Sequence, residues 1–181
     1  TIFAAPRLLT LDQANVILVP FTPFHLGPAS VLALALLRYA YLPALLLGSI
    51  APDIQPFLVM FFNLPGALHG PPLHTFIGST LLLALPLTAI LLILKKPIQT
   101  ITTPLKLNQN ATIQSILIGA LIGIYSHILL DATLYTDIQP FYPITQNPLL
   151  SQDPNRDYII YTACAVSFII ALAMYSIYLW K

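Results

Sequence analysis

The sequence predicts an all-α, polytopic membrane protein, and this prediction rests on its scarcity of charge and on three long apolar runs. Hydrophobic residues make up 57% of the 181 residues, whereas charged residues make up only 7%. Soluble domains carry roughly 25% charged residues, so this chain cannot cover a water-facing surface. The composition therefore excludes an ordinary cytosolic enzyme and a disordered protein. A formal net charge of +1 also excludes a nucleic-acid-binding protein, which needs a basic surface.

The three apolar runs are each long enough to cross the hydrocarbon core of a bilayer, which is about 30 Å thick. They cover residues 75–94, 113–130 and 158–180, and none of them contains Asp, Glu, Lys or Arg. The last run has Tyr and Trp near its ends, as expected at a membrane interface. Pro86 falls in the middle of the first run, where we expect it to kink the helix. The sequence thus predicts three long transmembrane helices.

Residues 26–53 have two interpretations. One continuous helix would be about 42 Å long, at ~1.5 Å per residue, and would bury Arg38 near its middle. Alternatively, Arg38 lies in a tight turn between short helices at 26–37 and 43–50. We adopt this short N-terminal helical hairpin, because it moves the charge to a membrane surface. The kinked single span is the alternative. A weaker apolar patch at 57–64 is interpreted as an interfacial helix or loop.

The chain divides into an N-terminal extension at 1–19, a membrane domain at 20–157 and an additional C-terminal transmembrane helix at 158–181. The boundary at 158 follows the last apolar run, and the segment at 20–157 contains the other two runs and all the histidines. The third segment is apolar almost throughout.

The distribution of lysine predicts which way the helices face. Lys95, Lys96 and Lys106 are assigned to the loop after residue 94, and Lys181 ends the sequence. By the positive-inside rule, this loop and the C-terminus lie in the cytoplasm. The connections at 53–74 and 131–157 then lie on the non-cytoplasmic face of the cell membrane.

All histidines are expected at this non-cytoplasmic end. They are His25, His69, His74 and His127. His127 and Asp131 are four residues apart, which places both side chains on one face of a helix. Imidazole nitrogens and carboxylate oxygens can share one metal ion, so the sequence predicts a metal site here. The alternative is that these side chains form only structural hydrogen bonds at the interface.

Four short segments, in this order, carry a family resemblance. They are PFHLG at 23–27, GSIAPD at 48–53, HGPPLHT at 69–75 and GIYSHILLD at 123–131. The chain resembles the membrane-bound metal-dependent hydrolases of the YdjM-like family of integral membrane proteins. A Pro-containing stretch at 140–143 is also similar, so the resemblance covers about residues 20–143.

The resemblance implies a set of metal ligands and a chemistry. The implied ligands are His25, Asp53, His74, His127 and Asp131. The implied cofactor is a divalent metal, and mixed His/Asp ligands favour zinc. Asp53, or alternatively Asp131, is the candidate catalytic base if it is not fully engaged as a ligand, and His69 would orient the substrate or donate a proton to the leaving group. The chain departs from the family pattern at Gly70, where the family has Arg, and at Ile54-Gln55, where it often has an acid.

Two functions from different classes follow. In the first, the protein hydrolyses a lipid-linked phosphoester or ester at the non-cytoplasmic membrane face. In the second, it is an accessory or structural subunit of a larger membrane complex, with a structural or vestigial metal site. The expected partners are membrane lipids, and in the second case other subunits, but not nucleic acid. Ion or proton passage is less well supported, because the other half of the bundle offers few polar residues.

Overall fold

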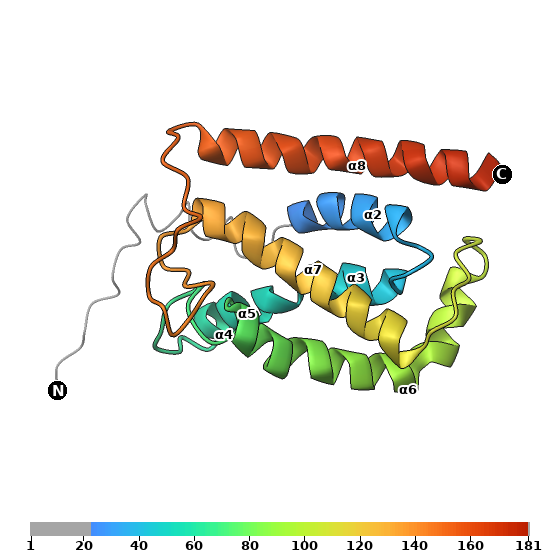
Figure 1. The fold of residues 1–181 in the computed structure, drawn as a ribbon, viewed down its shortest axis with the longest axis horizontal. Helices are drawn as coiled ribbons and strands as arrows, with labels where there is room; N and C mark the ends of the chain where they lie inside the picture. The colour runs from blue at the N-terminus through green and yellow to red at the C-terminus, as the bar shows by residue number, and fades with distance from the viewer. Residues whose placement is uncertain (1–22, 181) are drawn as a thin grey trace, which may run out of the picture.

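The computed structural model describes residues 23–180, and helices are the only regular elements in this range. The helices lie alongside one another, with α8 along one edge of the bundle (Figure 1). In chain order they are α2 (Leu26–Ala35), α3 (Leu42–Gly48), α4 (Ile54–Phe61), α5 (Phe76–Ser79), α6 (Leu85–Thr102), α7 (Ile113–Leu134) and α8 (Arg156–Trp180). The predicted extension at 1–19 and the cytoplasmic assignment of Lys181 concern positions outside the described residues.

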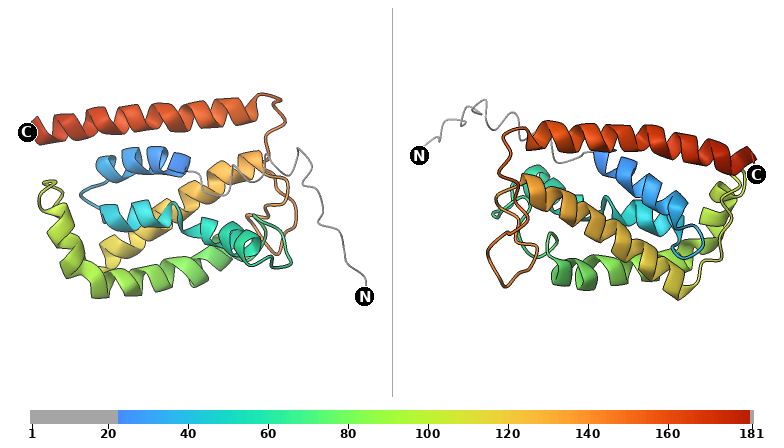
Figure 2. Two further views of the ribbon diagram at one scale, coloured as in Figure 1. Left: turned by 180° about the vertical axis from the view of Figure 1, so that it is seen from behind. Right: turned by 45° about the horizontal axis from the view of Figure 1, so that its top comes forward.

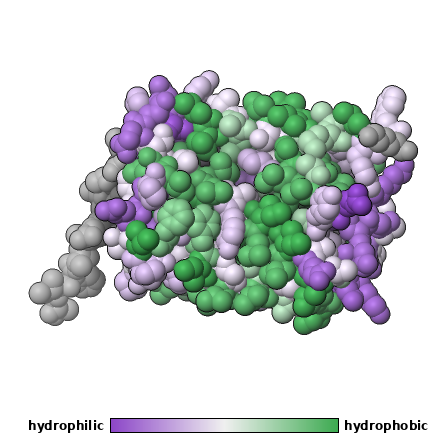
Figure 3. All heavy atoms as spheres, viewed as in Figure 1, coloured by the Kyte–Doolittle hydropathy of each residue, from purple (hydrophilic) through white to green (hydrophobic). Residues whose placement is uncertain are grey.

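The all-α membrane fold is confirmed. Four helical stretches are long and apolar enough to cross a membrane, and a shorter apolar helical stretch covers Pro23–Ala35. The four stretches are Leu42–Phe61, Phe76–Thr102, Ile113–Leu134 and Arg156–Trp180. Apolar side chains form a broad band between two more polar ends (Figure 3). The three long helices predicted from the sequence correspond to the last three stretches.

The N-terminal hairpin is confirmed, and the single-helix interpretation is wrong. The α2 helix ends at Ala35, Arg38 lies in the following turn, and α3 begins at Leu42. Pro43 occupies the first turn of α3, where a missing N–H costs nothing. The two helices run back alongside each other (Figures 1 and 2).

The patch at 57–64 belongs to a membrane span that the sequence analysis did not recognise. Its residues fall largely in α4, which follows α3 after a short 3₁₀ turn at Ala51–Asp53. Together these segments form the candidate span Leu42–Phe61. Pro52 and Pro56 suggested a loop, but both lie in first helical turns, where backbone N–H groups have no intrahelical partner.

Of the two expectations for the long helix predicted at 75–94, the placement of its lysines is wrong, whereas the kink at Pro86 stays a prediction. Lys95 and Lys96 lie within α6, not in the following loop, because the helix continues to Thr102. Before Pro86 the backbone widens into a π-helical segment at Thr80–Ala84, closed by a bond from the Leu85 N–H to the Thr80 carbonyl. Proline cannot donate the usual helical hydrogen bond, and a π-bulge is one way to accommodate that loss.

Close packing between α3 and α7 positions the site. Gly123 of α7 has no side chain, and a Cβ there would collide with the Leu45 carbonyl oxygen and lie 2.8 Å from the Ser49 nitrogen. A Cβ added at Gly119, one turn earlier, would likewise collide with the carbonyl oxygen of Tyr41. Small residues at this spacing let two helices approach to backbone contact. The end of α3 is therefore held directly against the C-terminal half of α7.

Candidate metal centre

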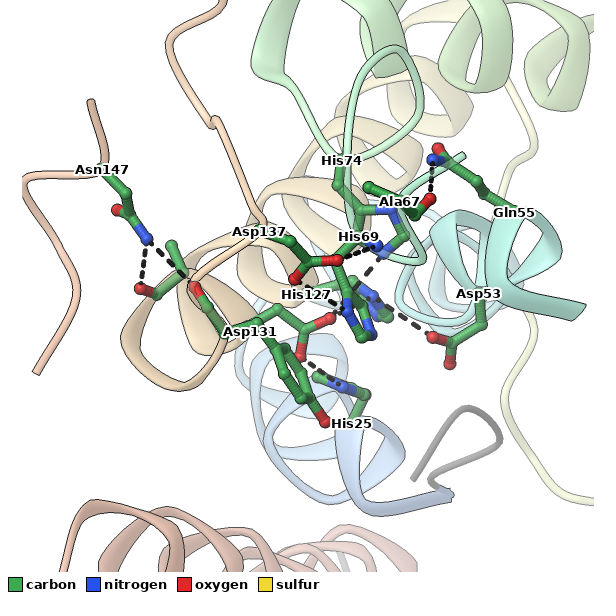
Figure 4. A network of polar contacts seen from close by, with 12 residues as sticks. His25, Asp53, Gln55, Ala67, His69, His74, His127, Asp131, Asp137 and Asn147 are labelled. Carbon is green, nitrogen blue, oxygen red and sulfur yellow. Dashed lines mark hydrogen bonds and ion pairs between the residues drawn. The ribbon is translucent and has the colours of Figure 1, made fainter. Parts of the chain in front are cut away.

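The predicted site residues converge at one end of the bundle (Figure 4). The end of α7 carries two of them, short 3₁₀ turns carry two more, and the loop between α4 and α5 carries the rest. In chain order they are His25, Asp53, His69, His74, His127 and Asp131. Most are buried among apolar helices, so their polar atoms must find partners within the protein or in a bound ligand.

Four of these residues form a compact group, which we call the four-residue group: Asp53, His74, His127 and Asp131. One potential ligand atom from each lies within 4.8 Å of all the others. The His127 Nε2 atom is 3.0 Å from Asp131 Oδ2 and 3.6 Å from Asp53 Oδ1. The His74 Nε2 atom is 3.8 Å from the same Asp131 oxygen. Two carboxylates and two imidazoles therefore face one another.

A backbone contact fixes the orientation of the His127 ring. Its Nδ1 atom lies 2.8 Å from the carbonyl oxygen of Ser49. A carbonyl can only accept, so we assign the proton to Nδ1, which leaves Nε2 as a lone pair in the neutral ring. That lone pair faces the carboxylates of Asp53 and Asp131. Metal-ligating histidines are typically held in this way, by a hydrogen bond from the nitrogen that does not bind the metal.

Several buried nitrogen atoms of the group have no hydrogen-bond partner among the described residues. They are both ring nitrogens of His74 and Nε2 of His127. An unsatisfied buried polar group costs roughly 1–3 kcal/mol, so these atoms need an explanation. Burial also lowers the pKa of His74 well below its usual value. A neutral imidazole is the form that binds metals. The group can therefore hold a metal ion.

His25, the fifth predicted ligand, lies beside the four-residue group and contacts it through Asp131. Its Nε2 atom is 3.2 Å from Asp131 Oδ1, the oxygen that does not face His127. Its ring also stacks on that of His127, with 4.0 Å between centroids. His25 is thus placed to fix the orientation of the Asp131 carboxylate.

His69 lies outside the four-residue group and has its own acidic partner, Asp137. The His69 Nδ1 atom is 3.4 Å from Asp137 Oδ1, and the His69 backbone N–H donates to Oδ2 at 3.0 Å. Burial raises the pKa of Asp137, but the hydrogen bonds from His69 outweigh it and hold the pKa below its usual value. The His69 ring stacks on Tyr135 and meets His74 edge-on at 5.2 Å.

Gln55 is a supporting residue that sequence reasoning did not assign to the site. Its Nε2 atom donates to the Ala67 carbonyl at 3.2 Å, and its Oε1 atom accepts from the Leu73 N–H at 3.1 Å. These contacts tie α4 to both ends of the loop segment that carries His69 and His74. The available signal was a polar residue within the apolar helix Ile54–Phe61.

The fold and the site together define a helical membrane protein with a buried His/Asp group that can hold a metal ion. The family model of the YdjM inner membrane protein matches residues 19–180, and the chain belongs to this family. This match confirms the YdjM-like resemblance. It also extends beyond the motifs that first indicated the family and includes α8. No curated protein and no solved structure matches the chain.

Proposed function

We propose that this inner membrane protein is a metal-dependent hydrolase of lipid-linked phosphoesters or esters, with its site on the non-cytoplasmic face. The observation that carries the proposal is the four-residue group, in which lone pairs of buried imidazoles face two carboxylates. Asp53, His74, His127 and Asp131 would hold the metal, with His25 supporting Asp131 or joining as a fifth ligand. Zinc suits this mixture of nitrogen and oxygen donors.

A divalent ion in such a site lowers the pKa of a bound water and polarises a phosphoryl or carbonyl oxygen. The two carboxylates are suited to different roles. An oxygen of Asp131 lies within 3.8 Å of a ring nitrogen in each of three imidazoles, which suits it to the role of a ligand. Asp53 makes one such contact, at 3.6 Å to His127. Asp53 is therefore the better candidate to accept a proton from the attacking water.

His69 would act on the leaving group. Asp137 holds its Nδ1 atom, which leaves Nε2 available to orient the substrate or to donate a proton to the leaving group. The flat stack on Tyr135, with centroids 3.8 Å apart, keeps the ring in place. A carboxylate that orients an imidazole is the arrangement expected of a proton-transfer pair.

The substrate class follows from where the site lies. The six site residues lie at one end of an apolar bundle of candidate membrane helices, where the connections at 62–75 and 135–155 also lie. A substrate anchored in the bilayer can reach this position by diffusing in the membrane plane. We therefore favour an ester or phosphoester whose other end is a lipid.

The second candidate function is that of a non-catalytic accessory subunit. Two ring side chains of the group, His74 and His127, are fully buried, which is typical of closed structural metal sites. The α8 helix also leaves most of its surface exposed to lipid or to other subunits. In this case the metal would hold α7 against its neighbours, and the partners would be membrane proteins.

The test of the first proposal is lipid hydrolysis by the purified full chain in vesicles. Release of fatty acid and of phosphate from glycerophospholipids is measured before and after chelation and after addition of zinc. We expect activity that chelation removes and zinc restores. Asp53→Asn and His69→Gln should each lower kcat by roughly 10²–10⁴-fold, whereas Asp153→Asn in an exposed loop should not.

Metal binding without turnover of any such lipid would refute the hydrolase and favour the accessory subunit. The accessory function would then gain support if chelation released the chain from a membrane complex. A chain that binds no metal and hydrolyses no lipid would refute the hydrolase and leave the accessory subunit with a vestigial site.

A further inference from the structure

A groove opens beside Asp53, between the start of α2, the end of α3, α4 and α6. Its volume is about 520 Å³, within the range of about 300–1,000 Å³ found for small-molecule sites. Among the described residues that line it, nearly all are apolar and Asp53 is the one charged residue. The apolar residues that matter most below are Leu47, Ile50, Ile54 and Leu87.

The groove faces the hydrocarbon region of the membrane. Leu47, Ile50 and Ile54 belong to the candidate span Leu42–Phe61 and keep 41%, 38% and 50% of their surface exposed. Leu87 lies in the facing span, about 17 Å along the helix axis from its start at ~1.5 Å per residue. The groove therefore extends from membrane depth to the level of the four-residue group, and the medium at its mouth is lipid acyl chain.

Asp53 belongs both to the groove wall and to the four-residue group. An apolar chain lying in the groove would thus have its polar end beside the candidate metal ligands. We propose that the groove holds one acyl chain of a glycerophospholipid, which enters sideways from the bilayer and presents its head-group esters at Asp53. The catalytic consequence rests on the proposed function, but the binding itself does not.

The affinity of the groove for such a lipid must come mainly from the polar end of the lipid. Lipid tails are as apolar as leucine, so moving an acyl chain from the bilayer into the groove yields little hydrophobic free energy. The groove fixes the position of the chain, and donor groups of the head group, such as the glycerol hydroxyls of phosphatidylglycerol, supply the preference by donating hydrogen bonds to the Asp53 carboxylate. Occupancy should therefore depend on the head group and on Asp53.

A second apolar pocket provides an internal control. It has a volume of about 290 Å³ and lies between α2, α3 and α8, and no carboxylate occurs among the described residues that line it. Leu172 lines this pocket and is exposed to the membrane. Lipid that merely fills surface hollows should occupy both places equally.

The experiment uses the full chain in vesicles of phosphatidylethanolamine and phosphatidylglycerol. A trace of phosphatidylglycerol carries a photoactivatable diazirine in one acyl chain, and mass spectrometry maps the adducts after irradiation. We expect adducts at Leu47, Ile50, Ile54 and Leu87 to exceed those at Leu172 several-fold. Added unlabelled phosphatidylglycerol should reduce the labelling of the groove residues toward that of Leu172. The variant Asp53→Asn should also reduce the labelling of the groove residues.

Two variants fill the groove from opposite sides. Ala51→Phe adds a ring in the lining, and Leu87→Trp enlarges the α6 wall if the first variant fails to assemble. Either one should remove the excess labelling in the groove and leave labelling at Leu172 unchanged. Ala165→Phe, on the exposed side of α8, is the matched control and should change nothing in the groove.

Equal labelling in groove and control pocket, or labelling that persists after the groove is filled, would overturn the inference. Metal content is measured on the same samples, because it separates the two proposals. A labelled groove in a chain without metal would refute the hydrolase while keeping the lipid site. A metal-loaded chain with an unlabelled groove would refute only the lipid site.

Discussion

The Nδ1 atom of His127 lies 2.8 Å from the carbonyl oxygen of Ser49, and this contact joins the centre of the candidate site to the end of α3. It depends on Gly123, one helical turn before His127, because that position brings the α3 backbone against α7. The same close packing thus stabilises the helix pair and orients the imidazole. Stability and metal affinity should therefore respond together when it is disturbed.

Gly123→Ala tests this dependence. The added Cβ would collide with the Leu45 carbonyl, so α3 and α7 must separate. We expect a loss of about 1–3 kcal/mol in stability and a roughly 10–100-fold loss of metal affinity as the His127 ring loses its backbone partner. Thermal unfolding in detergent and competition with a metal-binding dye measure the two effects. Ala165→Val on the exposed side of α8 is the control. Normal metal affinity in a destabilised Gly123→Ala protein would show that the two effects are independent.

Metal content separates members of the four-residue group from their neighbours. The double variant His127→Ala/Asp131→Ala removes two of four potential ligands and should abolish metal binding, as measured by elemental analysis of the purified chain. His25→Ala should weaken binding roughly 10–100-fold without changing the amount bound at saturation, because His25 reaches the group through Asp131. His69→Ala is the control and should keep its metal. If His25→Ala alone abolished binding at saturation, His25 would be a ligand.

The helices were largely predictable, because their signals are local. Arg38 and Pro43 indicated the hairpin, since a buried charge is expensive and proline favours the first turn of a helix. The span formed by α3 and α4 was missed because prolines at its interruption look like loop residues. The extension of α6 past Leu94 was missed because the apolar run marks the membrane, whereas the helix itself ends only at Thr102.

The site was predictable only in part. The spacing of His127 and Asp131 fixes their relative position, because both lie on one rigid helix. The loop that carries His69 and His74 has no such periodicity, so residue spacing could not show which histidine joins the group. The family resemblance implied that His74 is a ligand, but nothing in the sequence indicated that His69 pairs with Asp137. The Ser49 carbonyl is a backbone atom and has no side-chain signature at all.

Gln55 should control how well the loop presents His74. Gln55→Ala removes both contacts to the loop, whereas Gln55→Glu keeps an acceptor for the Leu73 N–H and loses only the donor to Ala67. Each hydrogen bond contributes about 0.5–1.5 kcal/mol, so we expect metal affinity to fall in the order wild type, Gln55→Glu, Gln55→Ala. Limited proteolysis between residues 62 and 75 should follow the same order. Equal behaviour of the two variants would assign the effect to the Ala67 contact alone.

Asp137 should make the loop that carries His69 sensitive to acid. Its pKa in the folded protein lies below the ordinary value of 3.8, because hydrogen bonds from His69 outweigh the opposing effect of burial. A depressed folded-state pKa means that the contact stabilises the protein fully above about pH 4 and is lost as the pH falls through the folded-state value. We therefore expect the difference in unfolding temperature between wild type and Asp137→Asn to be largest near pH 6 and to shrink toward pH 3. Comparison of the two proteins cancels the titration of the other acids, and Asp153→Asn in an exposed loop serves as the control. A difference that stayed constant over this range would show that the carboxylate charge of Asp137 does not stabilise the His69 loop.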